Sequence, residues 1–189
     1  DTFTAKITNN GSQATKVRID IQGTVDVGNH KVINSSMTST PNVGPYTDLE
    51  WGGSTLTIGA GATVEIEIKY DVNTDRGAPT NIMFFIDSSQ YDDSNNHSGE
   101  ITISEMEFSG VAEQPSEPSE PSEPSEPSEP SNPGDSVALT FGSTELYSVS
   151  TQDGKVNVQY TGVGGQTYKN IVSNISALAA DKDTFSITV

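Results

Sequence analysis

A run of Pro-Ser-Glu triplets divides this chain between Glu113 and Gly134. Proline at every third position fixes φ and removes backbone donors, so the run cannot join a sheet or a helix. We expect an extended spacer of the polyproline type over residues 113–134, stiffened by repulsion between its glutamates. The folded part must therefore come from residues 1–112, from residues 135–189, or from both together.

Apolar residues alternate with polar ones on both sides of the spacer. The stretch TKVRIDIQG places Val17, Ile19 and Ile21 on one face and charged or amide side chains on the other. The stretch ATVEIEIKYDV follows the same pattern. Period-two alternation is typical of strands with one buried face, and the continuously apolar TNIMFFID predicts a central strand.

Two stretches depart from simple alternation. The apolar positions of GEITISEMEFSG change parity between Ile103 and Met106, which predicts a β-bulge. The stretch YKNIVSNISALAAD has Ile171, Ile175 and Leu178 near helical spacing, which predicts a short helix. Many short strands with glycine-rich turns indicate an all-β fold, and we predict a jelly-roll β-sandwich with one short helix and the Pro-Ser-Glu linker.

The chain begins with DTFTAKI and ends with DTFSITV. If the portion after the spacer is placed before the first portion, so that Asp183 coincides with Asp1, the join reads as strand, turn and strand, with TNNGS as a hairpin. The joined length of roughly 160 residues is ordinary for one sandwich domain. We therefore expect the two portions to belong to one kind of module.

In this joined order the chain resembles the β-jelly-roll carbohydrate-binding modules of bacterial glucanases and related cell-surface proteins. Phrases such as KVRIDIQG and YTDLEWGGSTLTI carry the likeness, which covers nearly everything outside the spacer. The resemblance implies that residues 1–112 are the C-terminal part of a module and residues 135–189 the N-terminal part. It also implies a noncatalytic module of a secreted or surface protein that binds a neutral polysaccharide, with a β-glucan as the favoured example.

Sugar rings stack their apolar faces on aromatic side chains, and their hydroxyls bond planar polar groups. Trp51, beside two glycines in DLEWGGS, is the first candidate for such a platform; the alternative is that its indole caps the core. Tyr160 is a weaker candidate, because it suits the sandwich core equally well. The further candidate residues for carbohydrate binding are Tyr46, Tyr91, Tyr168, Gln90 and Arg76.

Calcium is the metal that the acidic turns suggest. Asp92 and Asp93 lie in QYDDSNNHSGE, whose oxygen ligands suit Ca²⁺, although the spacing does not match an EF-hand loop. The resemblance implies a structural calcium at the edge of the sandwich, with Glu105 and Glu145 as the nearest equivalents. Acidic turns without metal are the alternative in a chain of net charge -17.

Composition argues against several classes of function. With 9 lysines and arginines against 26 acidic residues, we expect no nucleic acid and no anionic membrane as a partner. The absence of cysteine excludes disulfides and thiol chemistry. No carboxylate pair stands out, and His30 and His97 lack a partner that would indicate catalysis, so we do not expect an enzyme.

The repeated DTF sequence at the two ends of the chain supports a second hypothesis of function. If the chain closes on itself, DTFTAKI and DTFSITV compete for one strand position. A surplus strand can pair with another molecule. The alternative function is therefore a structural repeat unit that self-associates through residues 1–7 and 183–189, by strand or module complementation, into a head-to-tail surface filament.

Overall fold

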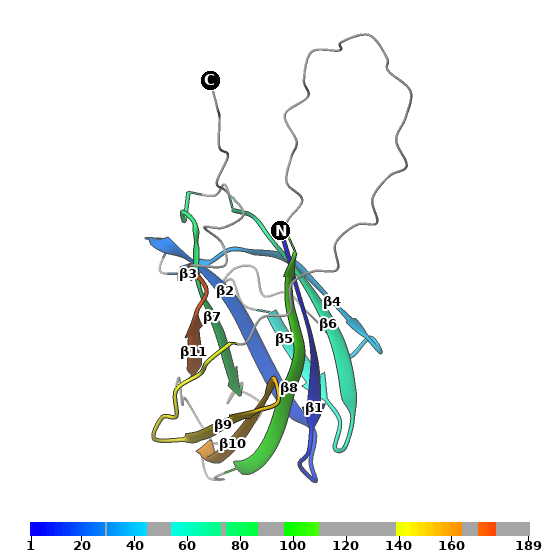
Figure 1. Cartoon of the computed structure of the whole chain (residues 1–189). Coiled ribbons are helices and arrows are strands. Elements are labelled where there is room, and N and C mark those ends of the chain that lie inside the picture. The colour runs from blue at the N-terminus through cyan, green and yellow to red at the C-terminus, as the bar shows by residue number, and fades with distance from the viewer. Residues whose placement is uncertain are drawn as a thin grey trace, which may run out of the picture.

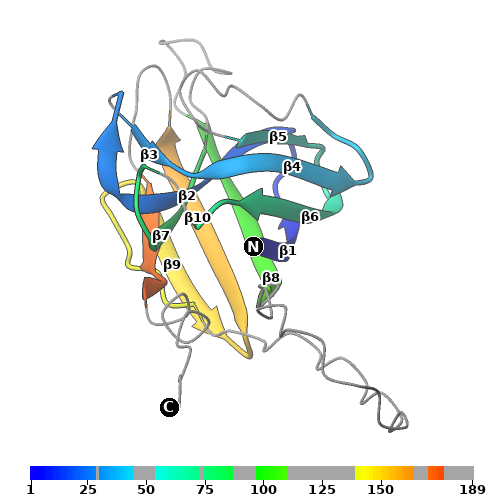
Figure 2. The same ribbon diagram turned by 90° about the horizontal axis from the view of Figure 1, so that it is seen from above.

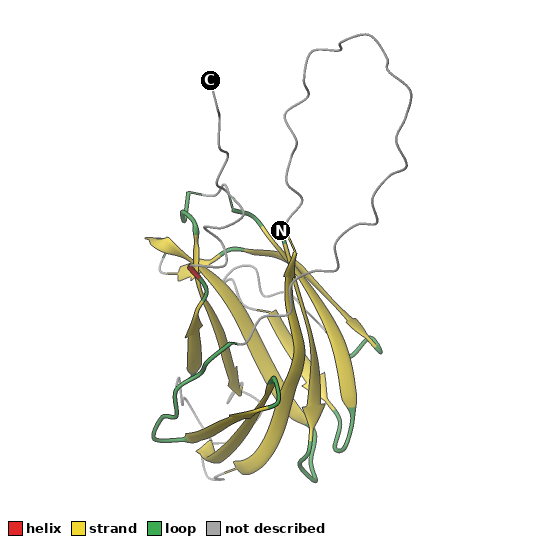
Figure 3. Cartoon of the chain, viewed as in Figure 1, coloured by secondary structure: helices red, strands yellow, loops and turns green. Residues whose placement is uncertain are grey.

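The computed structural model describes residues 1–28, 30–44, 54–72, 75–86, 97–109, 139–163 and 170–176, and in these ranges eleven strands form two antiparallel sheets (Figures 1 and 3). The six-stranded sheet has the order β4 (Asn34–Thr40), β6 (Thr63–Tyr70), β1 (Thr2–Asn9), β8 (His97–Ser109), β10 (Lys155–Val163), β9 (Tyr147–Gln152). The five-stranded sheet has the order β11 (Ile171–Asn174), β7 (Pro79–Ile86), β2 (Thr15–Val27), with β5 (Ser54–Ile58) and β3 (His30–Val32) both paired to β2.

The two sheets pack face to face around one hydrophobic core (Figure 2). Strict alternation in β1 and β6 turns every second side chain inward, as a half-buried strand requires. Phe3 of the six-stranded sheet meets Phe84 of the five-stranded sheet edge to face, with ring centroids 6.4 Å apart. The predicted β-sandwich is therefore confirmed.

Two local predictions are also confirmed. TNIMFFID forms most of β7, which lies between β2 and β11 with Ile82, Phe84 and Ile86 in the core. The register of β1 against β8 shifts between Thr4 and Lys6, and Glu105 adopts φ 51° at this point. This is the β-bulge that the change of apolar parity predicts.

The predicted helix is wrong for residues 171–174, which form β11. The buried positions are Ile171, Ser173 and Ile175, so the true period is two, and a serine at a buried position conceals it. Strand β11 pairs with β7 at the edge of its sheet. No helix among the described residues is long and apolar enough to cross a membrane.

The predicted hairpin between β1 and β2 is also wrong. Strand β1 pairs with β6 and β8, and β2 pairs with β3, β5 and β7, so the TNNGS turn crosses from one sheet to the other. Asn9 holds this corner: it is fully buried and donates from Nδ2 to the carbonyl oxygens of Gln13 at 2.7 Å and Ile58 at 3.0 Å. Its Oδ1 accepts a hydrogen bond from the Gly11 N–H at 2.9 Å.

Strands from both sides of the spacer lie in the same two sheets. Strand β10 pairs with β8, and β11 pairs with β7. Phe141, from beyond the spacer, packs edge to face on Phe84 with ring centroids 5.5 Å apart. The described residues after the spacer thus complete a core that begins before it.

Candidate functional site

Most of the predicted sugar-binding residues, namely Tyr46, Trp51, Gln90, Tyr91 and Tyr168, lie outside the described residues. The described residues next to them show which strands carry these segments. Ser54 opens β5, Ile86 ends β7 and Ile171 opens β11. All three strands belong to the five-stranded sheet. Each segment also joins a strand of the six-stranded sheet, namely β4, β8 or β10, so the outer faces of both sheets are considered as binding surfaces, beginning with that of the five-stranded sheet.

An ion pair occupies the centre of that outer face. Because Val17, Ile19 and Ile21 of β2 point into the core, the intervening Arg18 and Asp20 point outward. Arg18 Nε donates to Asp20 Oδ1 at 3.1 Å. Asp20 is nevertheless 2% exposed, so this outer face shelters its carboxylate from water.

Strand register gives the neighbours of this pair. Asn81 lies beside Gln22, Met83 lies beside Asp20, and Val172 of β11 follows next to Met83. Val172 is 39% exposed, one of the few large apolar side chains of the described surface that face water. We call this surface the β2–β7 face and define it by Arg18, Asp20, Gln22, Asn81, Met83 and Val172.

The β2–β7 face combines two kinds of chemistry. The guanidinium of Arg18 and the amides of Gln22 and Asn81 are partly exposed planar groups that match sugar hydroxyls, whereas the Asp20 carboxylate is buried. Met83 and Val172 offer apolar contact to the ring faces between those hydroxyls. The positions from Arg18 to Gln22 span about 13 Å along the strand, the length of a short oligosaccharide.

Arg76 lies away from the other predicted residues. Its guanidinium contacts Asp75 Oδ1 at 3.2 Å and donates to the Val27 carbonyl oxygen at 3.3 Å. It stands before the start of β7, whereas the segment with Gln90 and Tyr91 follows the other end of that strand. Gln90 and Tyr91 themselves lie outside the described residues, so the structure does not bring Arg76 together with them.

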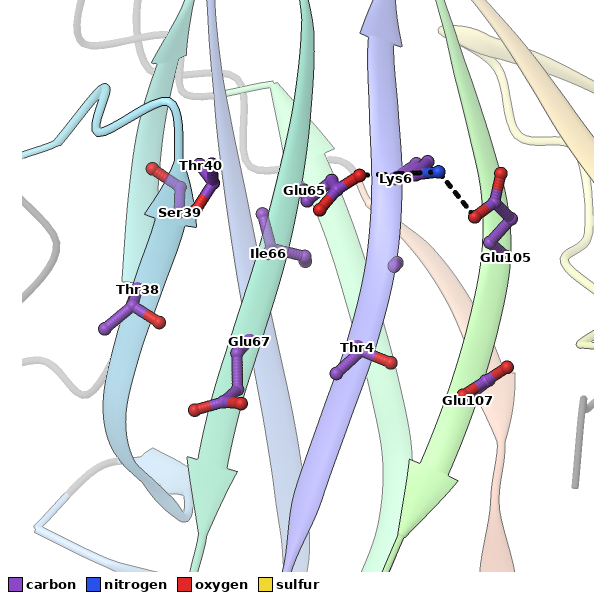
Figure 4. Close-up of a pocket in the computed structure, with 11 residues that line it drawn as sticks. Thr4, Lys6, Thr38, Ser39, Thr40, Glu65, Ile66, Glu67, Glu105 and Glu107 are labelled. Carbon is purple, nitrogen blue, oxygen red and sulfur yellow. Dashed lines mark ion pairs between the residues drawn. The ribbon is translucent and has the colours of Figure 1, made fainter. Parts of the chain in front are cut away.

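A polar groove of about 400 Å³ crosses the outer face of the six-stranded sheet (Figure 4). Lys6 of β1 lies at its centre, with Nζ 2.7 Å from Glu105 Oε2 and 3.4 Å from Glu65 Oε1. Hydrogen bonds to Glu105 first and Glu65 second raise the pKa of Lys6. With Glu67 and Glu107 also in its lining, the groove holds four carboxylates and one ammonium and so disfavours anionic ligands.

The two glutamates expected at a calcium site are not brought together. Glu105 lies on β8 beyond Ile103, beside Lys6. Glu145 precedes Leu146, whose carbonyl accepts from the Thr161 N–H near the opposite end of β8. Within the described ranges no group of three or more histidine or acidic side chains could hold a metal, and Asp92 and Asp93 lie outside those ranges.

Tyr160 belongs to the core, as the alternative interpretation held. It is 4% exposed, and its hydroxyl hydrogen-bonds the Thr15 hydroxyl at 2.8 Å. Sequence reasoning missed Arg18 and Asp20, although their i, i+2 spacing on the polar side of a strand was visible. Alternation alone predicts that both side chains are solvated, because the burial of Asp20 depends on neighbouring segments of the chain.

Comparison with known protein families, curated proteins and solved structures finds no match for this chain.

Proposed function

We propose that this chain is a noncatalytic carbohydrate-binding module of jelly-roll type, from a secreted or surface protein, that binds a neutral polysaccharide on the β2–β7 face. A β-glucan is the favoured ligand. The observation that supports this most is the row of partly exposed polar side chains that Arg18, Gln22 and Asn81 form on one outer sheet face, beside the exposed Val172.

The partly exposed groups of this face suit a hydroxyl-rich ligand. The guanidinium of Arg18 is held by Asp20, so little side-chain entropy is lost when a sugar binds beside it. The amides of Gln22 and Asn81 extend the same row of polar groups.

Charge favours a neutral ligand. The net charge of -17 repels sulfated or uronic polysaccharides, whereas a neutral glucan meets no such barrier. Affinity then depends on stacking as well as hydrogen bonds, and Trp51, which lies outside the described residues, remains the predicted platform. Calcium, with Asp92 and Asp93 as candidate ligands, remains a prediction as well.

Affinity electrophoresis in gels that contain a soluble neutral β-glucan tests the proposal. We expect Gln22→Ala and Trp51→Ala each to weaken retention about tenfold, with melting temperatures within a few degrees of the parent chain. Gln159→Ala is the matched control, since Gln159 lies exposed on the outer face of the other sheet and bonds Glu100 at 3.3 Å. It should bind as the parent does.

A further variant separates the two surfaces. Glu67→Gln alters the groove of the six-stranded sheet and leaves the β2–β7 face intact. If this variant lost retention while Gln22→Ala kept it, the groove would be the binding surface and the proposed face would be wrong. If the parent chain were retained by no neutral glucan, mannan or xylan, the proposed function itself would be overturned.

A further inference from the structure

The strands after the spacer supply a large share of the core. Strand β10 lies between β8 and β9, and β11 covers the edge of β7. Neither portion therefore closes a core by itself. In the described residues, eight buried apolar side chains come from beyond the spacer: Leu139, Phe141, Tyr147, Val156, Val158, Tyr160, Ile171 and Ile175.

Polar and steric contacts make this internal interface specific. The Tyr147 hydroxyl accepts a hydrogen bond from the Ile86 N–H at 3.2 Å, and the Tyr160 hydroxyl bonds Thr15. Gly99 leaves room for the Tyr160 ring, because a Cβ there would come 2.4 Å from its hydroxyl oxygen. A partner that fits residues 1–109 must carry these two tyrosines at this spacing, which a second copy of residues 139–176 does.

The covalent link between the portions restrains them weakly. Residues 110–138 include the whole Pro-Ser-Glu run and reach up to about 90 Å when extended. The contacts within one chain and between two chains are the same. Closed and exchanged forms therefore differ only by the effective concentration that the linker imposes, which is on the order of millimolar for a short flexible linker and no higher for the extended, stiff spacer expected here.

The repeated phrase gives an independent reason to expect exchange. Strand β1 buries Phe3, Ala5 and Ile7 between β6 and β8. The later portion carries apolar residues at the same spacing in DTFSITV, namely Phe185, Ile187 and Val189. Each portion thus contains a sequence that fits the single β1 position between β6 and β8. Such a duplication is expected if neighbouring modules of a longer array exchange this strand.

We propose that residues 139–176 of one chain complete the sandwich formed by residues 1–109 of a second copy. Reciprocal exchange produces a closed dimer, and exchange with a different neighbour at each end produces an open head-to-tail chain. Crowding of chains on a surface raises the local concentration toward the millimolar range and favours exchange. The inference is independent of polysaccharide binding.

Engineered disulfides test this directly, because the chain has no cysteine of its own. Thr102 and Asn157 lie opposite each other on β8 and β10, and Thr102 Oγ1 donates to Asn157 Oδ1 at 2.8 Å. Thr102→Cys and Asn157→Cys chains are mixed, refolded together at 1 µM to 1 mM and oxidised. We expect a covalent dimer whose fraction rises from about a hundredth or less to about half near 1 mM.

Two further pairs control the experiment. Thr102→Cys/Asn157→Cys in one chain should cross-link internally at 1 µM, which shows that the disulfide forms. The mixture of Thr8→Cys and Thr63→Cys chains should give no covalent dimer, since these hydroxyls lie 2.8 Å apart within the first portion. If the Thr102 and Asn157 mixture gave no more dimer than this control at 1 mM, exchange would be excluded.

Discussion

The corner between β1 and β2 depends on the side chain of Asn9. This residue is 0% exposed, and its side chain makes hydrogen bonds to the backbone of Gly11, Gln13, Ile58 and Gly59. Alanine at this position removes all four bonds. It also leaves the carbonyl of the fully buried Ile58 without this donor.

The contacts give the size of the effect. Each lost hydrogen bond costs about 1 kcal/mol, and a buried group left without its partner costs about 1–3 kcal/mol. With three part-buried bonds and the buried Ile58 carbonyl, we expect Asn9→Ala to lower the free energy of unfolding by about 4–6 kcal/mol. For a folded unit of this size that corresponds to a fall of about 15 °C in melting temperature.

Asn10→Ala is the matched control. Asn10 is the next residue, is exposed, and donates to the Thr102 hydroxyl at 2.8 Å. Its loss should cost less than about 1 kcal/mol, because water replaces an exposed partner. Urea unfolding followed by circular dichroism measures both variants, and equal losses would refute the role given to Asn9.

Asn9→Asp sharpens the same test. The substitution keeps the shape but points a carboxylate oxygen at the carbonyls of Gln13 and Ile58, where the amide donated. Protonation restores one donor, so burial and these carbonyls should raise the pKa of the new carboxyl group. Asn9→Asp should therefore be less stable than Asn9→Ala at pH 7 and recover relative to it as the pH falls toward 4. A pH-independent difference would contradict this.

Further predictions concern alkaline stability and close packing. Burial raises the pKa of Tyr70 to about 12, so its ionisation opposes folding as pH rises from about 10 to 12, by about 3 kcal/mol in full. Tyr70→Phe should flatten this part of the urea-measured stability profile, and an unchanged profile would contradict the assignment. Gly23→Ala would place a Cβ 2.3 Å from the Arg76 carbonyl oxygen and should cost about 2 kcal/mol, whereas Gly142→Ala, with open space around it, should change stability by less than about 0.5 kcal/mol. Equal melting temperatures for these two glycine variants would contradict this, because they would show that the backbone at Arg76 moves away at little cost.

Local sequence patterns predicted the strands but not their partners. Alternation in β6 gives its buried face directly, and the change of parity at Ile103 and Met106 gives the bulge. The TNNGS turn reads the same whether the chain folds back in one sheet or crosses to the other. That choice depends on β6 and β8, which lie far away in sequence and pair with β1.

The site was less predictable than the fold. Aromatic residues in glycine-rich segments could be recognised as candidates, because stacking on a sugar ring needs only one aromatic side chain. The Arg18–Asp20 pair could not be recognised in this way, because the burial of Asp20 depends on residues outside β2. Likewise, Val172 joins the face because β11 pairs with β7 across the spacer, and sequence order conceals that pairing.

The two proposals meet at the β7–β11 pairing. The β2–β7 face takes Val172 from the later portion and its other members from the first, so a bound polysaccharide contacts both portions. Closed and exchanged sandwiches present the same face, so a ligand binds them equally and cannot shift their ratio. Exchange requires β11 to leave β7, however, so the ligand should slow it. Prefolded Thr102→Cys and Asn157→Cys chains mixed with saturating β-glucan should therefore reach the same dimer fraction more slowly, and a changed final fraction would mean that the two forms present different faces.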